Sequence, residues 1–83
     1  MDSRRKRLLY RSTHCGMIEN DILLGCFASR NLSTMSETDL DDFELLLAEC
    51  DNDLYNWITG KEALPAHLDS PVMAAILAFR KWS

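Results

Sequence analysis

The most informative stretch of this sequence runs from Cys15 to Leu24 and reads Cys-Gly-Met-Ile-Glu-Asn-Asp-Ile-Leu-Leu. Gly16 gives the backbone a conformational freedom that other residues lack. Glu19 follows three residues later, in the expected first turn of a helix, where the helix dipole favours a negative charge. A basic segment, residues 4–11, leads directly into this bend. The stretch therefore predicts a glycine bend between two helices, flanked by charges of both signs.

The length and composition of the chain limit the classes of protein to which it can belong. It has 83 residues, of which 47% are hydrophobic and 27% are charged. This balance is typical of a soluble globular protein rather than a disordered one, and the length predicts a single domain over residues 1–83. No apolar run approaches the roughly 18 to 20 residues that span a bilayer, so we expect no membrane insertion.

The cysteines indicate neither a disulfide framework nor a zinc site. There are three, Cys15, Cys26 and Cys50, and none of their spacings forms a Cys-x-x-Cys pair. Cys26 and Cys50 fall at apolar helical positions, where we expect small buried side chains. His67 has no partner at the spacing of metal ligands, so no metal site is expected. The glycines form no phosphate-binding motif, so no cofactor site is expected in this chain.

The net charge of −4 hides an uneven distribution of charge. Five of the nine basic residues lie in the first eleven positions, whereas eight acidic residues and no basic one lie between Glu37 and Asp53. A nucleic-acid-binding protein normally carries a net basic face, so the acidic middle argues against nucleic acid as a partner. The acidic run lacks the glycine and terminal glutamate of a calcium loop and indicates a solvated helix face. The basic start is either a solvated helix end or a binding surface.

The spacing of apolar residues, with few glycines and prolines, predicts helices and no strand. The expected fold class is all-α, a compact five-helix bundle with short connections. The alternative is a smaller bundle whose first helix is frayed and becomes ordered only on a partner. The helices are expected at about residues 3–13, 17–30, 36–50, 51–59 and 71–82.

The second expected helix is apolar on more than one side. Ile18, Ile22 and Cys26 form one row along it, and Leu23 and Phe27 form the row beside it. We therefore expect this helix to be the central and most buried one.

Local signals refine the other helices. Gly25 is expected to be a close-packing site that a neighbouring helix approaches. Ser36 with Asp39 resembles a capping box, and Gly60 is expected to end the fourth helix. Trp57 is expected in the core, with its indole N–H reaching a carbonyl.

Catalysis has little support in the sequence. His14 and Cys15 are adjacent, and a thiol near a helix N-terminus can have a lowered pKa. However, no third group is evident that would orient the histidine as a base. We therefore expect no catalytic residue and place both side chains on an exposed corner, and a thiol enzyme that uses Cys15 is the alternative.

Four blocks of the sequence, in their order and spacing, resemble the small succinate dehydrogenase assembly factors. This family is called SdhE in bacteria, and its mitochondrial branch is succinate dehydrogenase assembly factor 2. The blocks are residues 7–10 (Arg-Leu-Leu-Tyr), 16–20 (Gly-Met-Ile-Glu-Asn), 22–28 (from Ile-Leu-Leu to Phe-Ala) and 53–57 (Asp-Leu-Tyr-Asn-Trp). The resemblance covers nearly the whole chain.

The resemblance implies a five-helix bundle that binds the flavoprotein subunit of succinate dehydrogenase, or of the related fumarate reductase. Such proteins act as chaperone-like assembly factors and promote covalent attachment of FAD to a histidine of that subunit. Such proteins need not catalyse the bond themselves, so this chain is expected not to be an enzyme, and the partner is expected to carry the FAD. A monomer that forms a heterodimer is expected, in the bacterial cytoplasm first and the mitochondrial matrix second. The alternative function is a non-catalytic interaction module that regulates another enzyme.

The family signature is Arg-Gly-x-x-Glu, and this chain departs from it at one position. Gly16 and Glu19 match, but Cys15 stands where the family has arginine, and His14 stands at the usually basic position before it. An arginine offers five donors in a fixed fork and a permanent charge, and a cysteine offers neither. The missing contact could be supplied by Arg11, by a compensating change in the partner, or by nothing.

The bend and the helix before it are the predicted partner-binding surface. Glu19 has a second interpretation, as a simple helix cap. A bend buried inside the molecule would refute the prediction. The predicted partner-binding residues are Arg7, Tyr10, Arg11, His14, Cys15, Gly16, Met17 and Glu19.

Overall fold

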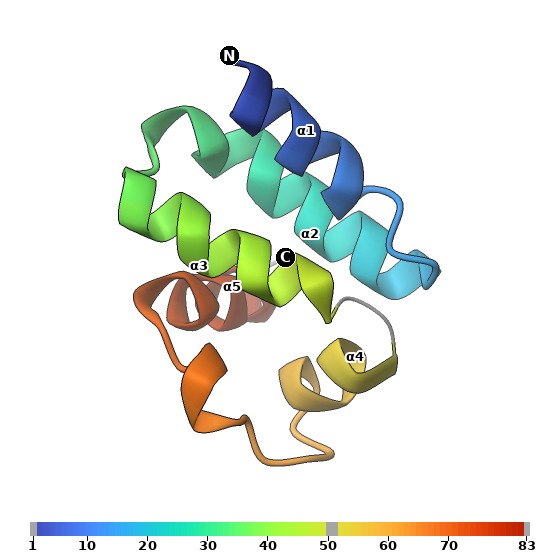
Figure 1. Ribbon diagram of the computed structural model, residues 1–83. Coiled ribbons are helices and arrows are strands. Elements are labelled where there is room, and N and C mark those ends of the chain that lie inside the picture. The colour runs from blue at the N-terminus through green and yellow to red at the C-terminus, as the bar shows by residue number, and fades with distance from the viewer. Residues whose placement is uncertain (1, 50–51, 83) are drawn as a thin grey trace.

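The computed structural model describes residues 2–49 and 52–82, and in this part of the chain all regular structure is helical (Figure 1). The all-α prediction with five α-helices is therefore confirmed. Two short 3₁₀-helices, η1 and η2, join the α-helices. The elements are α1 (Ser3–Ser12), α2 (Ile18–Asn31), η1 (Leu32–Thr34), α3 (Glu37–Ala48), α4 (Asn52–Ile58), η2 (Ala66–Leu68) and α5 (Pro71–Trp82).

Short-range hydrogen bonds explain where several helices begin. The Asp2 carboxylate accepts the backbone N–H of Arg5 at 2.9 Å, which starts α1 and lowers the pKa of Asp2. The Ser36 hydroxyl accepts the N–H of Asp39 at 3.2 Å, so the predicted cap of α3 is confirmed. Gly60 has a φ of 79° and lies two residues after the end of α4, as expected of a helix stop.

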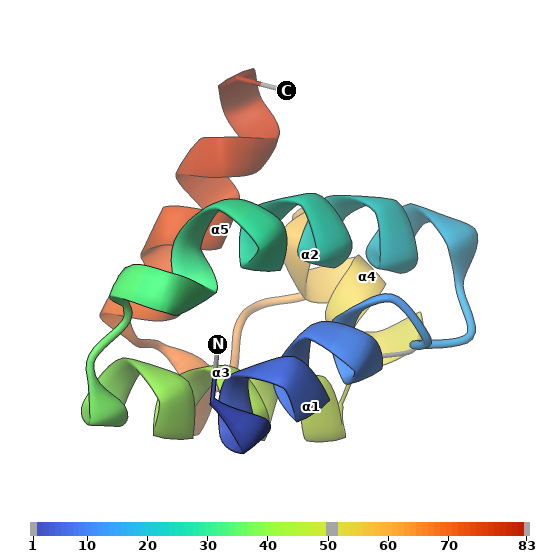
Figure 2. The same cartoon turned by 90° about the horizontal axis from the view of Figure 1, so that it is seen from above.

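The core lies where the helices meet. α1 packs against α2 and α3, and α5 packs against the same two helices (Figures 1 and 2). Phe43 is fully buried in α3, and the Phe27 ring lies 5.9 Å from it and 5.8 Å from the Phe79 ring. Trp57 packs against this core but is only partly buried. The buried apolar side chains are those of Leu8, Leu24, Phe27, Ala28, Leu32, Met35, Leu40, Phe43, Leu46, Leu47, Leu54, Ile58, Leu68, Val72, Met73 and Ile76.

The buried face of α2 is not the one expected from the first apolar row. Ile18 is 74% exposed and Ile22 is 62% exposed, and Cys26 is exposed as well. The core side of α2 instead carries Leu24 and Phe27, with Ala28 beside them. The prediction that Cys26 is buried is therefore wrong, and Cys50 lies outside the described residues.

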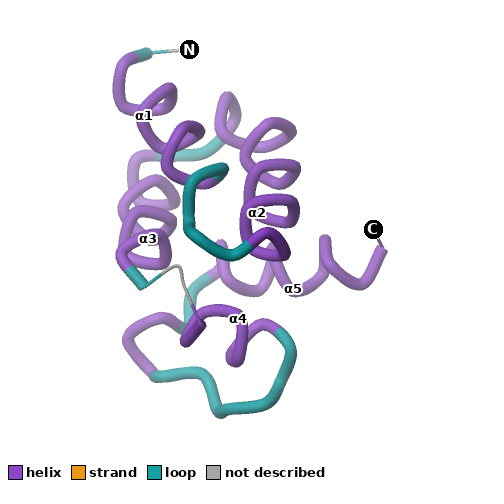
Figure 3. The backbone as a smooth tube through the Cα atoms, turned by 90° about the vertical axis from the view of Figure 1, so that its right-hand side faces the viewer, coloured by secondary structure: helices purple, strands orange, loops and turns teal. Residues whose placement is uncertain are grey.

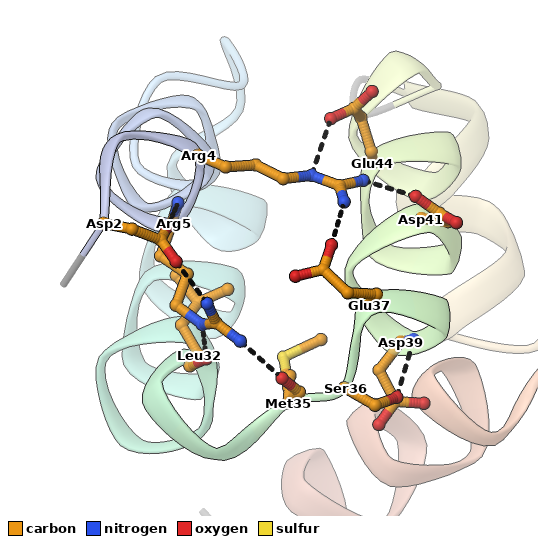
Figure 4. Close-up of polar contacts among 10 residues, drawn as sticks. All are labelled: Asp2, Arg4, Arg5, Leu32, Met35, Ser36, Glu37, Asp39, Asp41 and Glu44. Carbon is orange, nitrogen blue, oxygen red and sulfur yellow. Dashed lines mark hydrogen bonds and ion pairs between the residues drawn. The ribbon is translucent and has the colours of Figure 1, made fainter.

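α1 is firmly attached to the bundle, so the alternative with a frayed first helix is wrong. Leu8 is fully buried, and two arginines of α1 bind other elements (Figure 4). Arg5 donates from Nε to the Leu32 carbonyl at 2.7 Å and from Nη2 to the Met35 carbonyl at 2.6 Å, and it also pairs with the Asp2 carboxylate. These bonds cap the carbonyls that surround η1.

Arg4 connects α1 to the acidic face of α3 (Figure 4). Its guanidinium lies 2.5 Å from Asp41, 2.9 Å from Glu37 and 3.8 Å from Glu44. The hydrogen bond to Asp41 is the main reason why the pKa of Arg4 is raised. Because the three carboxylates are largely exposed, water screens each ion pair and each contributes little to stability. Arg4 and Arg5 thus have structural partners and form no part of a free binding surface.

Gly25 is a close-packing site, as predicted. A Cβ atom at this position would lie 2.7 Å from Cγ2 of Thr13, the residue that follows α1. The Thr13 hydroxyl donates to the Tyr10 carbonyl at 2.9 Å, which fixes its side chain. The absence of a side chain at Gly25 therefore lets α2 lie close to the end of α1. This close packing determines where the bend between the two helices lies.

Candidate functional site

The bend between α1 and α2 lies at the surface, as the predicted binding site requires (Figure 3). Gly16 is exposed and has a φ of 95°, which favours glycine over other residues. A Cβ atom added there would meet nothing within 4 Å. The glycine is therefore required by the backbone conformation rather than by lack of space, and it leaves the bend open to a partner.

Local hydrogen bonds hold the end of α1. Ser12 is buried and its hydroxyl donates to the Leu9 carbonyl at 2.6 Å. His14 donates from Nδ1 to the Tyr10 carbonyl at 2.7 Å. The Cys15 thiol lies 3.5 Å from the Arg11 carbonyl. Carbonyls that a helix end usually exposes are thus occupied by the bend itself, which stiffens it.

Asp21 holds the bend from the other side. Its Oδ1 accepts the backbone N–H of Cys15 at 2.6 Å, six residues earlier, while its own N–H donates to the Met17 carbonyl at 2.9 Å. Sequence reasoning assigned no role to Asp21. One signal in the sequence could have indicated this role. Asp21 lies in the first turn of α2, and the residue before that helix, Met17, has no side-chain oxygen that could cap it.

Glu19 presents an exposed carboxylate beside the bend. Within residues 2–49 and 52–82 this carboxylate makes no hydrogen bond and no ion pair, so the interpretation of Glu19 as a helix cap is wrong. It lies in the first turn of α2, where the helix dipole favours its charge. Glu19 is therefore available to a donor from another molecule.

The residues predicted on α1 do not all face the same way. Tyr10 is 64% exposed and stacks on His14, with ring centroids 3.9 Å apart and planes 15° apart. Arg7 is exposed. Arg11 is half-buried and lines a shallow depression with Asp41 and Glu44, so it lies toward α3 rather than toward Glu19.

Cys15 and Met17 are half-buried parts of the bend. The Cys15 thiol is directed at the carbonyls of Arg11 and Ser12, at 3.5 and 3.9 Å. His14 uses Nδ1 for the Tyr10 carbonyl, and its ring stacks on Tyr10. This arrangement gives no support to a catalytic pair of Cys15 and His14.

Neither a candidate metal-binding cluster nor a candidate membrane span is found in the part of the chain that the structure describes. No cluster of three or more histidine, cysteine, aspartate or glutamate side chains that could hold a metal ion occurs there. Among the same residues, no helix has both the length and the apolar character needed to cross a membrane.

Comparison with known proteins agrees with the resemblance in the sequence. The family described as "flavinator of succinate dehydrogenase" matches residues 6–80. A relative in Dictyostelium discoideum, "succinate dehydrogenase assembly factor 2, mitochondrial", is 43% identical over 72 residues, which cover 87% of this chain and 51% of that protein. The protein of the same name in Danio rerio is 42% identical over 83 residues, covering 98% of this chain and 52% of that protein.

A bacterial protein is also similar to this chain. "FAD assembly factor SdhE" of Acetobacter pasteurianus is 38% identical over 71 residues, which cover 86% of this chain and 65% of that protein. The chain thus spans about half the length of the two mitochondrial relatives. Because mitochondrial and bacterial proteins both match, the expected compartment stays a prediction. The match over residues 6–80 and these identities show that the chain belongs to the family of flavinators of succinate dehydrogenase.

Proposed function

We propose that this protein binds the flavoprotein subunit of succinate dehydrogenase as an assembly factor and promotes covalent attachment of FAD to it. Family membership and the names of the relatives support the partner and the process. The observation that carries the proposal is the stiff, exposed bend at Gly16 with the unpaired carboxylate of Glu19 beside it. We further propose that the chain is a monomer that forms a one-to-one heterodimer with that subunit.

Each feature of the bend would have its own role in the contact. Because Gly16 has no side chain, the backbone of the flavoprotein can approach closely. Glu19 can accept a charge-assisted hydrogen bond from an arginine, a lysine or a backbone N–H of the partner. The stacked rings of Tyr10 and His14 provide a flat aromatic contact, which is typical of residues that contribute strongly to binding.

Promotion of flavinylation would follow from binding alone. A partner that binds one conformation of the flavoprotein more tightly raises the population of that conformation. A preference of about 10⁴-fold converts a 1% population into a 99% population. The bond to FAD would then form by the chemistry of FAD and the flavoprotein, and we assign no catalytic residue to this chain. FAD is assigned to the partner because this chain has no glycine-rich phosphate loop.

Co-expression with a succinate dehydrogenase flavoprotein subunit tests the proposal. Covalent flavin would be measured by fluorescence of the denatured subunit in a gel, with equal amounts of flavoprotein loaded. We expect at least a several-fold higher signal when this chain is present. Equal fluorescence with and without the chain would contradict the proposed function.

A further inference from the structure

A groove of about 470 Å³ lies between α2, α4 and α5, next to the bend. Figure 3 shows the three helices that form it, and Figure 2 shows that the last turns of α5 extend past α2. The walls of the groove include apolar side chains from all three helices, among them Leu23, Tyr55 and Phe79. Such a mixture of aliphatic and aromatic walls is typical of surfaces that receive an apolar segment of another molecule.

The groove is continuous with the bend along the outer face of α2. Ile18 and Ile22 are 74% and 62% exposed and lie one turn apart, and Ile22 also lines the groove. Glu19, the exposed carboxylate beside the bend, lines the same groove. A row of large exposed apolar side chains that leads into a groove indicates an interaction surface rather than scattered surface residues.

Three charged side chains line the groove: Glu19 and Arg30 of α2, and Arg80 of α5. Glu19 lies at the end near the bend, and Arg30 lies eleven residues later on the same helix, about 16 Å away along its axis. The Arg30 guanidinium lies over the Phe79 ring, 5.5 Å from its centroid, and this cation–π contact holds the positive charge at the wall. Along α2, an occupant therefore meets a negative charge at Glu19 and a positive charge at Arg30, with apolar side chains between them and the further positive charge of Arg80 on α5.

We propose that this groove binds an amphipathic helix of about three turns from the flavoprotein subunit. Its apolar face would lie against Ile22, Leu23 and Phe79. A basic side chain near one end would pair with Glu19, and an acidic side chain about eleven residues away would pair with Arg30. This inference rests on the proposed function, because it identifies which part of that partner the assembly factor holds.

Binding of the purified flavoprotein subunit to purified variants of the full chain tests the inference. Ile22→Asp places a charge on the apolar row, and Arg30→Glu reverses the positive charge at Arg30. Since both side chains are exposed, both variants are expected to fold, which circular dichroism would check. We expect each variant to weaken the flavoprotein complex at least tenfold in a titration by calorimetry.

Two matched variants serve as controls. Leu45→Asp places the same charge on a 51%-exposed leucine of α3, and Lys6→Glu reverses an exposed charge on α1; neither residue lines the groove. Both controls should bind within twofold of the unmodified chain. If the groove variants also bind within twofold, the inference is overturned while the proposed function stands. If the unmodified chain does not bind the flavoprotein, both are overturned.

A second copy of the chain is the competing occupant. Sedimentation of the chain alone would reveal it as a dimer at micromolar concentration that Ile22→Asp dissociates. Such a dimer, together with unchanged flavoprotein binding by Ile22→Asp, would assign the groove to self-association and overturn the proposal. A monomer at these concentrations, with tenfold weaker flavoprotein binding by both groove variants, supports it.

Discussion

Replacing Gly16 by arginine is expected to weaken binding of the flavoprotein subunit by more than 100-fold. The φ of 95° at this position is strained for any residue with a Cβ atom, so the bend must deform or lose about 1–2 kcal/mol of stability. In either case the long side chain would occupy the surface that the partner is proposed to approach. Calorimetric titration with the flavoprotein would measure the loss, and 100-fold corresponds to about 2.7 kcal/mol.

Gly60→Arg is the matched control for strain. Gly60 is exposed, has a φ of 79°, and an added Cβ there would also meet nothing within 4 Å. It follows α4, outside the bend and outside the residues that line the groove. Both variants should lose similar stability, but only Gly16→Arg should lose binding. An equal loss of binding in both would mean that strain, and not the bend surface, caused it.

Glu19→Ala separates binding from stability further. Its carboxylate has no partner in the described residues, so its removal should cost no more than the helix-dipole contribution of about 0.3–1 kcal/mol. If the flavoprotein donates a buried hydrogen bond to Glu19, loss of that bond should cost about 2–5 kcal/mol of binding. A large loss of stability with unchanged binding would instead make Glu19 a structural residue.

The second large effect is expected from Cys15→Arg, which restores the arginine of the family signature. We expect this variant to raise covalent flavin on the co-expressed flavoprotein about tenfold, because a hydrogen bond to a charged group contributes about 1.5–3 kcal/mol. The change removes the weak thiol contacts with the Arg11 and Ser12 carbonyls, but the bend should survive it because the Asp21 carboxylate accepts the backbone N–H of Cys15. Arg11 is a poor substitute, because it lies toward Asp41 and Glu44.

Two further variants at Cys15 control this result. Cys15→Ser keeps the size of the side chain and adds no charge, so its flavin signal should equal that of the unmodified chain. Cys15→Lys adds the charge without the planar fork and should give an intermediate signal. A signal from Cys15→Arg no higher than that from Cys15→Ser would contradict the expectation that the missing arginine limits activity.

The helices could be predicted because their ends depend on nearby residues. Ser36 caps α3 through Asp39, and Gly60 follows α4 with a positive φ, as the sequence indicated. Gly16 was likewise recognisable as a bend. These features need only local backbone geometry, which a few residues determine.

Long-range choices could not be predicted in the same way. α2 has apolar residues on opposite faces, and only packing against α1, α4 and α5 decided that Leu24 is buried while Ile22 is exposed. The hydrogen bond from the backbone N–H of Cys15 to the Asp21 carboxylate depends on the turn that the chain makes at Gly16. The sequence also could not show that Arg4 binds α3 whereas Arg7 stays exposed, because that depends on where α3 lies.

The most direct test of the account is a photo-crosslink from the bend to the flavoprotein. p-Benzoylphenylalanine would replace His14, which is exposed in the bend, or Thr38, which is exposed in the first turn of α3. Figure 1 shows that α3 begins on the side of the molecule opposite the bend. After irradiation of the complex with the flavoprotein subunit, the account predicts a crosslinked heterodimer from position 14 and none from position 38. A crosslink from position 38 alone would contradict the claim that the bend is the docking surface.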